Sequence, residues 1–155
     1  VALVNAKTAR KKAKAVRATD KLRKDAIKTR GDWIKEVQIA FNKFIRTRDR
    51  AQPCICCGKP FEPAKFGGSM DAGHYLSRGA APHLRFDERN VHGQRKNCNR
   101  PGGTTREAFR KGMAERIGAV ALDALECDQR SRDWTIDDLR AIKATYLAKI
   151  KELQT

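Results

Sequence analysis

The segment from Cys54 to Asn99 limits the possible folds more than any other part of the chain. It contains four of the five cysteines and all three histidines of the sequence. Prolines and glycines interrupt it so often that it cannot build a hydrophobic core of its own. A metal ion that links its loops would supply the missing stability. The segment therefore predicts a loop-rich centre of zinc-knuckle type, with helices packed around it.

The charge of the chain indicates a polyanionic partner. The 155 residues carry a net charge of +16, and residues 1–50 alone hold sixteen Lys and Arg against five Asp and Glu. This excess points first to nucleic acid. No apolar run approaches the roughly 18 residues of a membrane-spanning helix, and no signal peptide is visible. We therefore expect no membrane partner, and we expect the protein to stay in a reducing cytoplasm. Clustered cysteines there more often bind metal than form disulfides.

The residues before the cysteines favour helix. From Ala6 to Arg50 there is no proline and only one glycine, in a composition rich in good helix formers. From Trp33 onward, apolar residues recur at steps of three and four, which predicts an amphipathic, packed helix. The basic first half lacks such a stripe and is expected to extend into solvent. It is either a merely solvated helix or an arm whose cations contact phosphates, namely Lys11, Lys12, Lys14 and Arg17.

The rest of the chain alternates between loops and helices. Short extended pieces are expected at 69–75 and 83–86. The residues before Gly118 predict a helix that this glycine ends, and a further short helix is expected at 120–125. Thr135 is predicted to cap a last amphipathic helix that runs to Leu153, with the acidic Asp138 at its third position.

Cys54 and Cys57 form a C-x-x-C turn, which aims two thiolates at one metal ion. Cys56 lies between them and leaves the choice of ligand open. Cys98 is the expected third ligand. Three residues before it, where a second C-x-x-C would begin, stands Arg95.

Arg95 leaves three possibilities open, because a guanidinium is always protonated and does not bind zinc. Zinc could be held by the three cysteines with a water molecule or His92 as the fourth ligand. Zinc could be absent, with the turn held by packing. The chain could also be an inactive copy.

A second set of side chains is interleaved with the cysteines. His74 follows Asp71 near the end of an expected strand, Asn90 comes sixteen residues later, and Asn99 directly follows Cys98. This layout resembles the HNH, or ββα-metal, nuclease motif in a variant that ends in Asn.

Longer strings around these residues resemble the phage NinG (Rap) family of recombination proteins. They are DAGHYLSR at 71–78, GAAPHLRF at 79–86, NVHGQ at 90–94 and CNR at 98–100, and the similarity runs over most of residues 33–155. We accordingly expect a mainly α fold with a small ββα-metal module. Residues 1–50 form the basic arm and amphipathic helix, 51–105 the nuclease module and 106–155 the C-terminal helices, in one compact unit. Family members usually carry a cysteine-rich module before the basic helix, so we expect this chain to be a fragment that begins after it.

The resemblance implies a metal-dependent, structure-selective endonuclease that acts on branched DNA, such as Holliday junctions and D-loops, in the bacterial host cell. His74 would take a proton from the attacking water, and Asn90 would hold the His74 ring. Asp71 and Asn99 would hold one Mg²⁺ or Mn²⁺. Three nearby arginines are expected to contact phosphates: Arg78, Arg85 and Arg100.

A non-catalytic module that binds branched DNA, mediates recombination and retains the HNH scaffold is the alternative. Both hypotheses require the basic surface, but only the endonuclease requires a working metal site. Symmetric cleavage of a Holliday junction would favour a homodimer, although no sequence feature identifies an interface.

Overall fold

Two helices, rather than one, precede the cysteines. In the computed structural model, which describes residues 2–62 and 69–154, they are α1 (Ala2–Ala26) and α2 (Arg30–Arg48). Thr29 caps α2: its side chain accepts a hydrogen bond from the Asp32 backbone, and the Asp32 carboxylate accepts one from the Thr29 backbone. Such a capping box begins a new helix. The prediction of one helix through residues 27–29 is therefore wrong.

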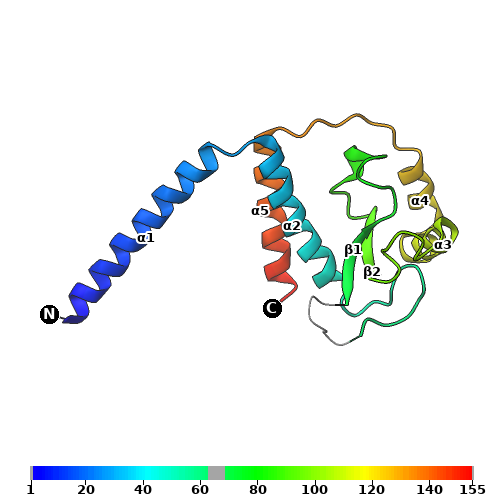
Figure 1. Cartoon of the computed structure of the whole chain (residues 1–155), viewed down its shortest axis with the longest axis horizontal. Helices are drawn as coiled ribbons and strands as arrows, with labels where there is room; N and C mark the ends of the chain where they lie inside the picture. The colour runs from blue at the N-terminus through cyan, green and yellow to red at the C-terminus, as the bar shows by residue number, and fades with distance from the viewer. Residues whose placement is uncertain (1, 63–68, 155) are drawn as a thin grey trace.

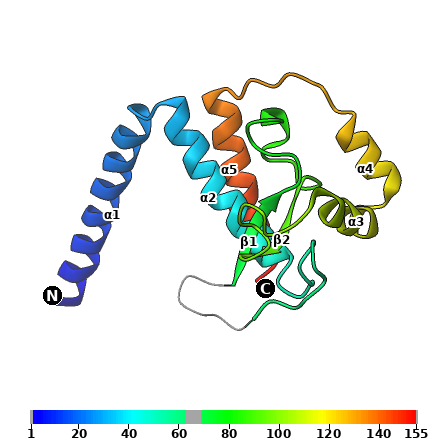
Figure 2. The same ribbon diagram turned by 45° about the vertical axis from the view of Figure 1, so that its right-hand side comes forward.

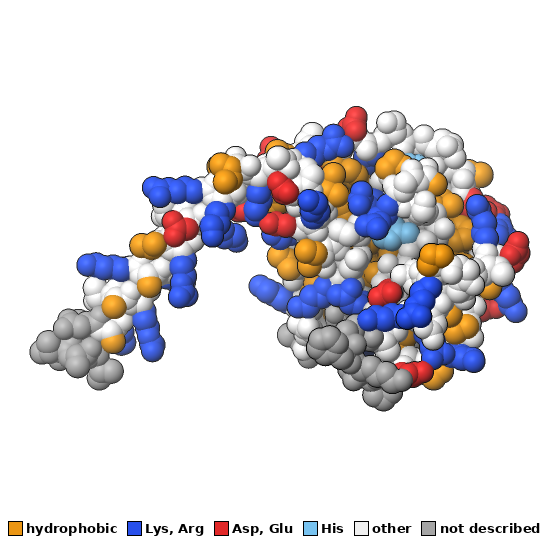
Figure 3. Space-filling view, in the orientation of Figure 1, with side chains coloured by type: hydrophobic (Ala, Val, Ile, Leu, Met, Phe, Trp, Pro, Cys, Tyr) orange, Lys and Arg blue, Asp and Glu red, His pale blue; other side chains and the backbone are white. Residues whose placement is uncertain are grey.

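Helix α1 projects away from the rest of the molecule (Figures 1 and 2). Almost all of its described side chains, from residue 6 onward, are exposed. Lys and Arg side chains point outward along it (Figure 3). The predicted extension of this helix into solvent is confirmed, whereas its contact with phosphates stays a prediction.

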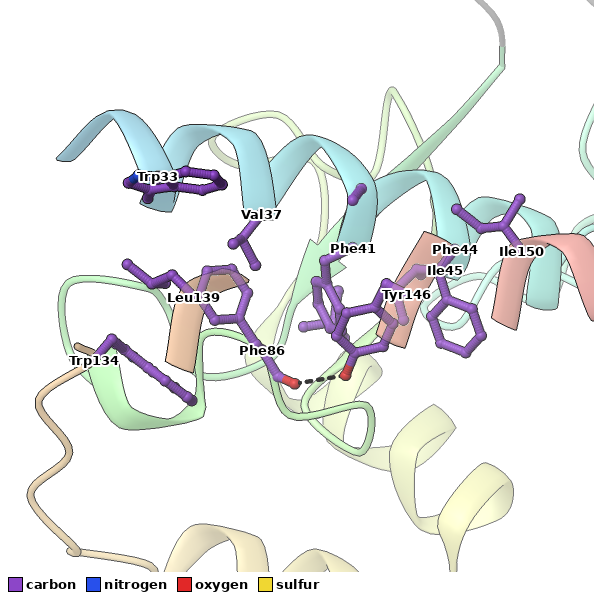
Figure 4. Packing of buried hydrophobic residues seen from close by; sticks show 12 residues of the cluster. Trp33, Val37, Phe41, Phe44, Ile45, Phe86, Trp134, Leu139, Tyr146 and Ile150 are labelled. Carbon is purple, nitrogen blue, oxygen red and sulfur yellow. Dashed lines mark hydrogen bonds between the residues drawn. The ribbon is translucent and has the colours of Figure 1, made fainter. Parts of the chain in front are cut away.

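The main hydrophobic core lies between α2 and α5 (Ile136–Glu152), which run side by side (Figures 1 and 4). The apolar stripe predicted from Trp33 onward provides its α2 face. Phe41 packs edge-on against Phe86 and Tyr146, and the Tyr146 hydroxyl donates to the Phe86 carbonyl at 3.1 Å. The predicted cap of α5 by Thr135 and Asp138 is confirmed as a full capping box.

A two-stranded antiparallel sheet connects this core to the cysteines. Strand β1 (Met70–His74) pairs with β2 (Val91–Arg95), so that Met70 lies opposite Arg95 and His74 opposite Val91. The first extended piece was predicted correctly. The second, at 83–86, is wrong, because Pro82 begins a short 3-10 helix, η1 (Pro82–Leu84).

Helices α3 (Arg106–Ile117) and α4 (Ala119–Glu126) form a second apolar cluster on the other side of the hairpin from α2 and α5 (Figures 1 and 2). Gly118 separates them with a φ of 85°, as its predicted role as a helix stop requires. Ile55 of the cysteine turn belongs to this cluster. A Cβ at Gly112 would lie 1.7 Å from the Ile55 carbonyl oxygen, so α3 packs directly on the cysteine turn.

Within the described ranges, no helix combines the length and the apolar character that crossing a membrane requires.

Candidate active site and metal cluster

A surface cavity of about 450 Å³ brings together three of the residues that the sequence grouped. Asp71 and His74 reach it from β1, and Asn99 reaches it from the turn after β2. The segment after β1 adds Arg78, and α2 adds two polar residues that the sequence analysis missed, Asn42 and Arg46. The cavity therefore combines a histidine, hard oxygen donors and cations, which suits a reaction at a phosphate.

The hydrogen bonds of His74 indicate which ring nitrogen is basic. Its Nε2 lies 3.0 Å from the Arg85 carbonyl oxygen. Since a carbonyl only accepts, Nε2 carries the hydrogen and donates, which leaves Nδ1 of the neutral ring as an acceptor. Burial lowers the pKa of His74, and the charges of Arg78 and Arg85 lower it further, against the opposing effect of the carbonyl bond. The imidazole is therefore neutral at pH 7 and can accept a proton.

Arg85 is oriented by a neutral partner. Its Nε donates to Gln38 Oε1 at 2.9 Å, and Gln38 Nε2 in turn donates to Asn42 Oδ1 at 2.8 Å. Gln38 is only 7% exposed, so this chain of amides is fixed in the packing of α2. Burial and the nearby Arg78 lower the pKa of Arg85, as expected of two cations held close together. An amide partner leaves the charge of Arg85 uncancelled.

The two candidate ligands of a divalent ion are in contact. Asn99 Nδ2 donates to Asp71 Oδ2 at 3.1 Å. This bond engages the amide nitrogen of Asn99 and one carboxylate oxygen of Asp71. The second carboxylate oxygen of Asp71 and the amide oxygen of Asn99 are hard donors of the kind that Mg²⁺ and Mn²⁺ prefer. The donor set thus fits such an ion.

Asn90 does not line the cavity. The side chain is fully buried; its Nδ2 donates to the carbonyls of Leu76 and Leu84, and its Oδ1 accepts from the Leu76 backbone. The prediction that Asn90 holds the His74 ring directly is wrong, because these backbone bonds occupy its amide. Asn90 instead fixes the residue before Arg85. The carbonyl of Arg85 in turn holds His74.

The cysteines form a separate cluster. The sulfur atoms of Cys54, Cys57 and Cys98 all lie within 4.8 Å of one another. Zn–S bonds of about 2.3 Å at tetrahedral angles require sulfurs about 3.8 Å apart, so this cluster could hold a metal such as zinc with little adjustment. The Cys56 sulfur accepts a hydrogen bond from Gln94 Nε2 at 3.1 Å and is not part of the cluster. The choice between Cys56 and Cys57 that the sequence left open therefore falls on Cys57.

The backbone of Arg95 contacts the cysteine cluster, whereas its side chain pairs with a residue outside the cluster. Its backbone N–H donates to the Cys54 sulfur at 3.3 Å, and its guanidinium pairs with Glu62 at 2.6 Å. The pKa of Cys54 is lowered, first by a hydrogen bond with Cys56 and also by backbone N–H groups that include Arg95. A lowered pKa favours the thiolate that binds metal.

His92 is not the fourth ligand. Its ring is 3% exposed, with Nε2 at 3.0 Å from the Arg89 carbonyl and Nδ1 at 3.2 Å from the Arg48 guanidinium. The same corner holds Asp49, whose carboxylate accepts from the Gly93 backbone at 2.7 Å. His92 thus fastens β2 to the end of α2, and the three cysteines leave one coordination position for another ligand, such as water.

The remaining predicted phosphate contacts are exposed. Arg100 lies outside the residues that line the cavity. Four further cations lie on the projecting helix α1: Lys11, Lys12, Lys14 and Arg17.

The family model and the similar proteins that match this chain all belong to one family. The family model described as "Bacteriophage Lambda NinG protein" matches residues 1–155. Protein ninG of Salmonella phage P22 is 46% identical over 134 residues, which cover 86% of this chain and 64% of that relative. Protein ninG of Escherichia phage lambda is 44% identical over 134 residues, or 86% of this chain and 63% of that relative. The match thus spans less than two thirds of these relatives. No solved structure matches the chain.

Proposed function

Since this chain belongs to the NinG family of phage proteins, we propose that it is a metal-dependent endonuclease that cleaves branched DNA, such as Holliday junctions, during phage recombination in the bacterial host cell. The observation that carries the proposal is the single cavity lined by Asp71, His74 and Asn99, with Arg46 and Arg78 beside them. The order of β1, β2 and α3 along the chain is compatible with a ββα-metal module.

In the proposed reaction, His74 acts as the general base. Nδ1 takes one proton from a water molecule as the water oxygen attacks the phosphorus, and the bond from phosphorus to the 3′-oxygen breaks. The departing oxygen then takes a proton from solvent. The Arg85 carbonyl holds the ring through Nε2, so Nδ1 is the nitrogen available for this transfer.

Charge stabilisation comes from two sources in this proposal. Asp71 and Asn99 would hold a divalent ion through their oxygens, and such an ion would supply positive charge to the phosphate and the leaving oxygen. Arg46 and Arg78, which line the cavity, bind the non-bridging oxygens, since guanidinium groups form paired hydrogen bonds with phosphate. Zinc at the cysteines would have a structural role only.

Helix α1 supplies sequence-independent affinity for DNA. Its exposed cations can contact phosphates at some distance from the cavity, with the strong salt dependence of such contacts. Preference for a branched substrate could then come from the combination of an arm and a cavity that engage different parts of the DNA.

Cleavage of a synthetic four-way junction in Mg²⁺ tests the proposal. We expect the unmodified chain to nick the junction and the His74→Ala variant to bind it with equal affinity but cleave it at least about a hundredfold more slowly. Asn99→Ala should also lose cleavage. The exposed neighbour Asn97 offers a matched control, because Asn97→Ala leaves the cavity intact.

The alternative function predicts a different outcome. A recombination mediator that only binds branched DNA would show salt-dependent junction binding without nicking in Mg²⁺ or Mn²⁺. Undiminished cleavage by His74→Ala would reject the role of His74 as the base.

A further inference from the structure

A second cavity, of about 310 Å³, is lined by Arg85, which does not line the first cavity. The first turns of α2 contribute Arg30 and Ile34 to its lining, and the segment between α4 and α5 contributes Arg132 and Trp134. The reaction described above gives this cavity no role.

The lining of the second cavity carries an excess of positive charge. Three arginines, Arg30, Arg85 and Arg132, face one carboxylate, Asp133. Arg30 and Asp133 lie 3.7 Å apart with side chains 54% and 91% exposed, so their pairing is weak. The neighbouring cavity of about 580 Å³ shares Arg132 but suits anions less well, since three carboxylates, Asp87, Glu88 and Asp128, outnumber its two arginines, Arg130 and Arg132.

Two of these arginines are ordered by uncharged partners. The Arg132 guanidinium lies 4.2 Å from the centre of the Trp134 ring, which is buried. A stacked guanidinium keeps the N–H groups at its edge available for paired bonds to a phosphate. Arg85 is held by the amide of Gln38. Both side chains are thus oriented without losing charge.

Helix α2 connects the two cavities. Arg30 and Ile34 line the second cavity, and Asn42 and Arg46 line the first, while Gln38 lies midway and bonds to Arg85. Residues four apart lie along one face of a helix. From residue 30 to residue 42 the helix advances about 18 Å. Because a DNA strand winds around its duplex, two phosphates of one strand are this far apart after only a few nucleotides.

We propose that the second cavity binds a backbone phosphate of the same DNA strand whose scissile phosphate enters the first cavity, a few nucleotides away. The identity of that strand rests on the proposed function. Arg30 and Arg132 are the residues that hold this distant phosphate, and Arg85 lies between the two sites. The contact fixes the direction of the strand across α2.

The test measures binding of a four-way junction without divalent ions, so that no cleavage is needed. Each phosphate near the crossover is replaced in turn by a neutral methylphosphonate. For the unmodified chain, we expect a several-fold loss of affinity at one position a few nucleotides from the phosphate most affected in the first cavity. The Arg30→Gln/Arg132→Gln variant should bind more weakly, with a salt slope lower by about one, and lose no further affinity at that position.

The matched control removes two exposed cations elsewhere. Lys111→Gln/Lys151→Gln makes the same change of charge on α3 and α5, away from both cavities. It should keep the full pattern of sensitive positions. Arg132→Lys keeps the charge but loses the paired geometry, and should restore only part of the affinity. Thermal unfolding checks that each variant folds.

The results separate this inference from the nuclease proposal. If the unmodified chain shows the position-specific loss and never cleaves, the second site stands and the endonuclease assignment fails. If the double variant remains as sensitive as the unmodified chain at that position, or if neutralisation has equal effects at all positions, the second site is rejected. Tight binding of inorganic phosphate at Arg132 without any position-specific effect on the junction would also reject it.

Discussion

His74 is positioned by the backbone of Arg85, while the side chain of Arg85 is positioned by Gln38. One residue therefore governs both the orientation and the electrostatic surroundings of the base. The neutral amide of Gln38 is important in this arrangement, because a carboxylate at the same place would cancel the charge of Arg85.

Replacement of Gln38 by Glu tests this arrangement with little change in shape. The new carboxylate can still accept from Arg85, but its negative charge stabilises protonated His74 and so raises the pKa of the ring. We expect the acid side of the pH–rate profile to move to higher pH and junction binding to weaken. Gln52→Glu adds the same charge at an exposed position and serves as the control. Identical profiles for both variants would exclude an electrostatic role for Gln38.

His92 makes stability depend on pH. Burial, above all, and the nearby Arg48 lower the pKa of His92 to about 4 from an ordinary value of 6.5. Between these values the unfolded chain binds a proton that the folded chain does not, so the free energy of unfolding falls as pH decreases from 6.5 to 4, by on the order of 3 kcal/mol. Denaturant unfolding across this window measures the loss. His92→Gln should flatten the dependence, and an unchanged slope would contradict the assignment.

The residues of the site differ in how far the sequence could predict them. Asp71, His74 and Asn99 were grouped by spacing and do line one cavity, although their roles stay predictions. Gln38 and Arg46 could not be found in this way. Both lie in α2, far from the grouped residues in the sequence. Packing of α2 against β1 brings Arg46 to the cavity, and Gln38 bonds to Arg85 nearby.

At the scale of elements, the sequence predicted what local patterns determine. The apolar stripes, the Thr135 cap and the Gly118 stop are local features, and each was confirmed. The break at residues 27–29 was present as the Thr29 and Asp32 capping box but was outweighed by helix propensity on both sides. Strand β2 was missed because pairing with β1, rather than its own composition, makes it a strand.

The contact of α3 with the cysteine turn can be tested at Gly112. A methyl group there would overlap the Ile55 carbonyl oxygen at 1.7 Å, so α3 must shift in the Gly112→Ala variant. We expect a loss of about 2–3 kcal/mol in the free energy of unfolding, although Ala favours helix. Gly79→Ala is the control, since a Cβ at Gly79 meets nothing within 4 Å. Equal stability of the two variants would show that the contact carries no strain.

Removal of the metal should loosen the cysteine turn and its neighbours. We expect about one zinc ion per purified chain and a lower melting temperature after chelation. Cys57→Ser should lose the ion and respond no further to the chelator, whereas Cys127→Ser, at an exposed cysteine outside the cluster, should behave as the unmodified chain. Absence of zinc from freshly purified protein would contradict the three-cysteine site.

At the scale of the whole molecule, α1 is attached to the rest chiefly through the short segment before α2. Lys28 bridges the break, with its Nζ 2.6 Å from Asp25 and 2.6 Å from Glu36. These ion pairs are part-exposed and are weakened by salt. The main core between α2 and α5 does not depend on α1.

Truncation before Asp25 should therefore separate stability from DNA binding. We expect the melting temperature to change by no more than a few degrees, and the affinity for DNA to fall together with the salt slope of binding. Unfolding curves and binding titrations at several salt concentrations measure the two effects. Unchanged affinity would exclude α1 as a DNA-binding arm.

The length of α1 also has a consequence for the footprint on DNA. Its 25 residues give a helix of about 37 Å, close to one turn of duplex. Helix α1 leaves the rest of the molecule at the break before α2. DNA duplex bound along α1 would therefore add to the length of duplex that the protein protects at the cavity. The protected length should accordingly shrink by about one turn of duplex on one side when α1 is removed, while the position of the cut stays the same.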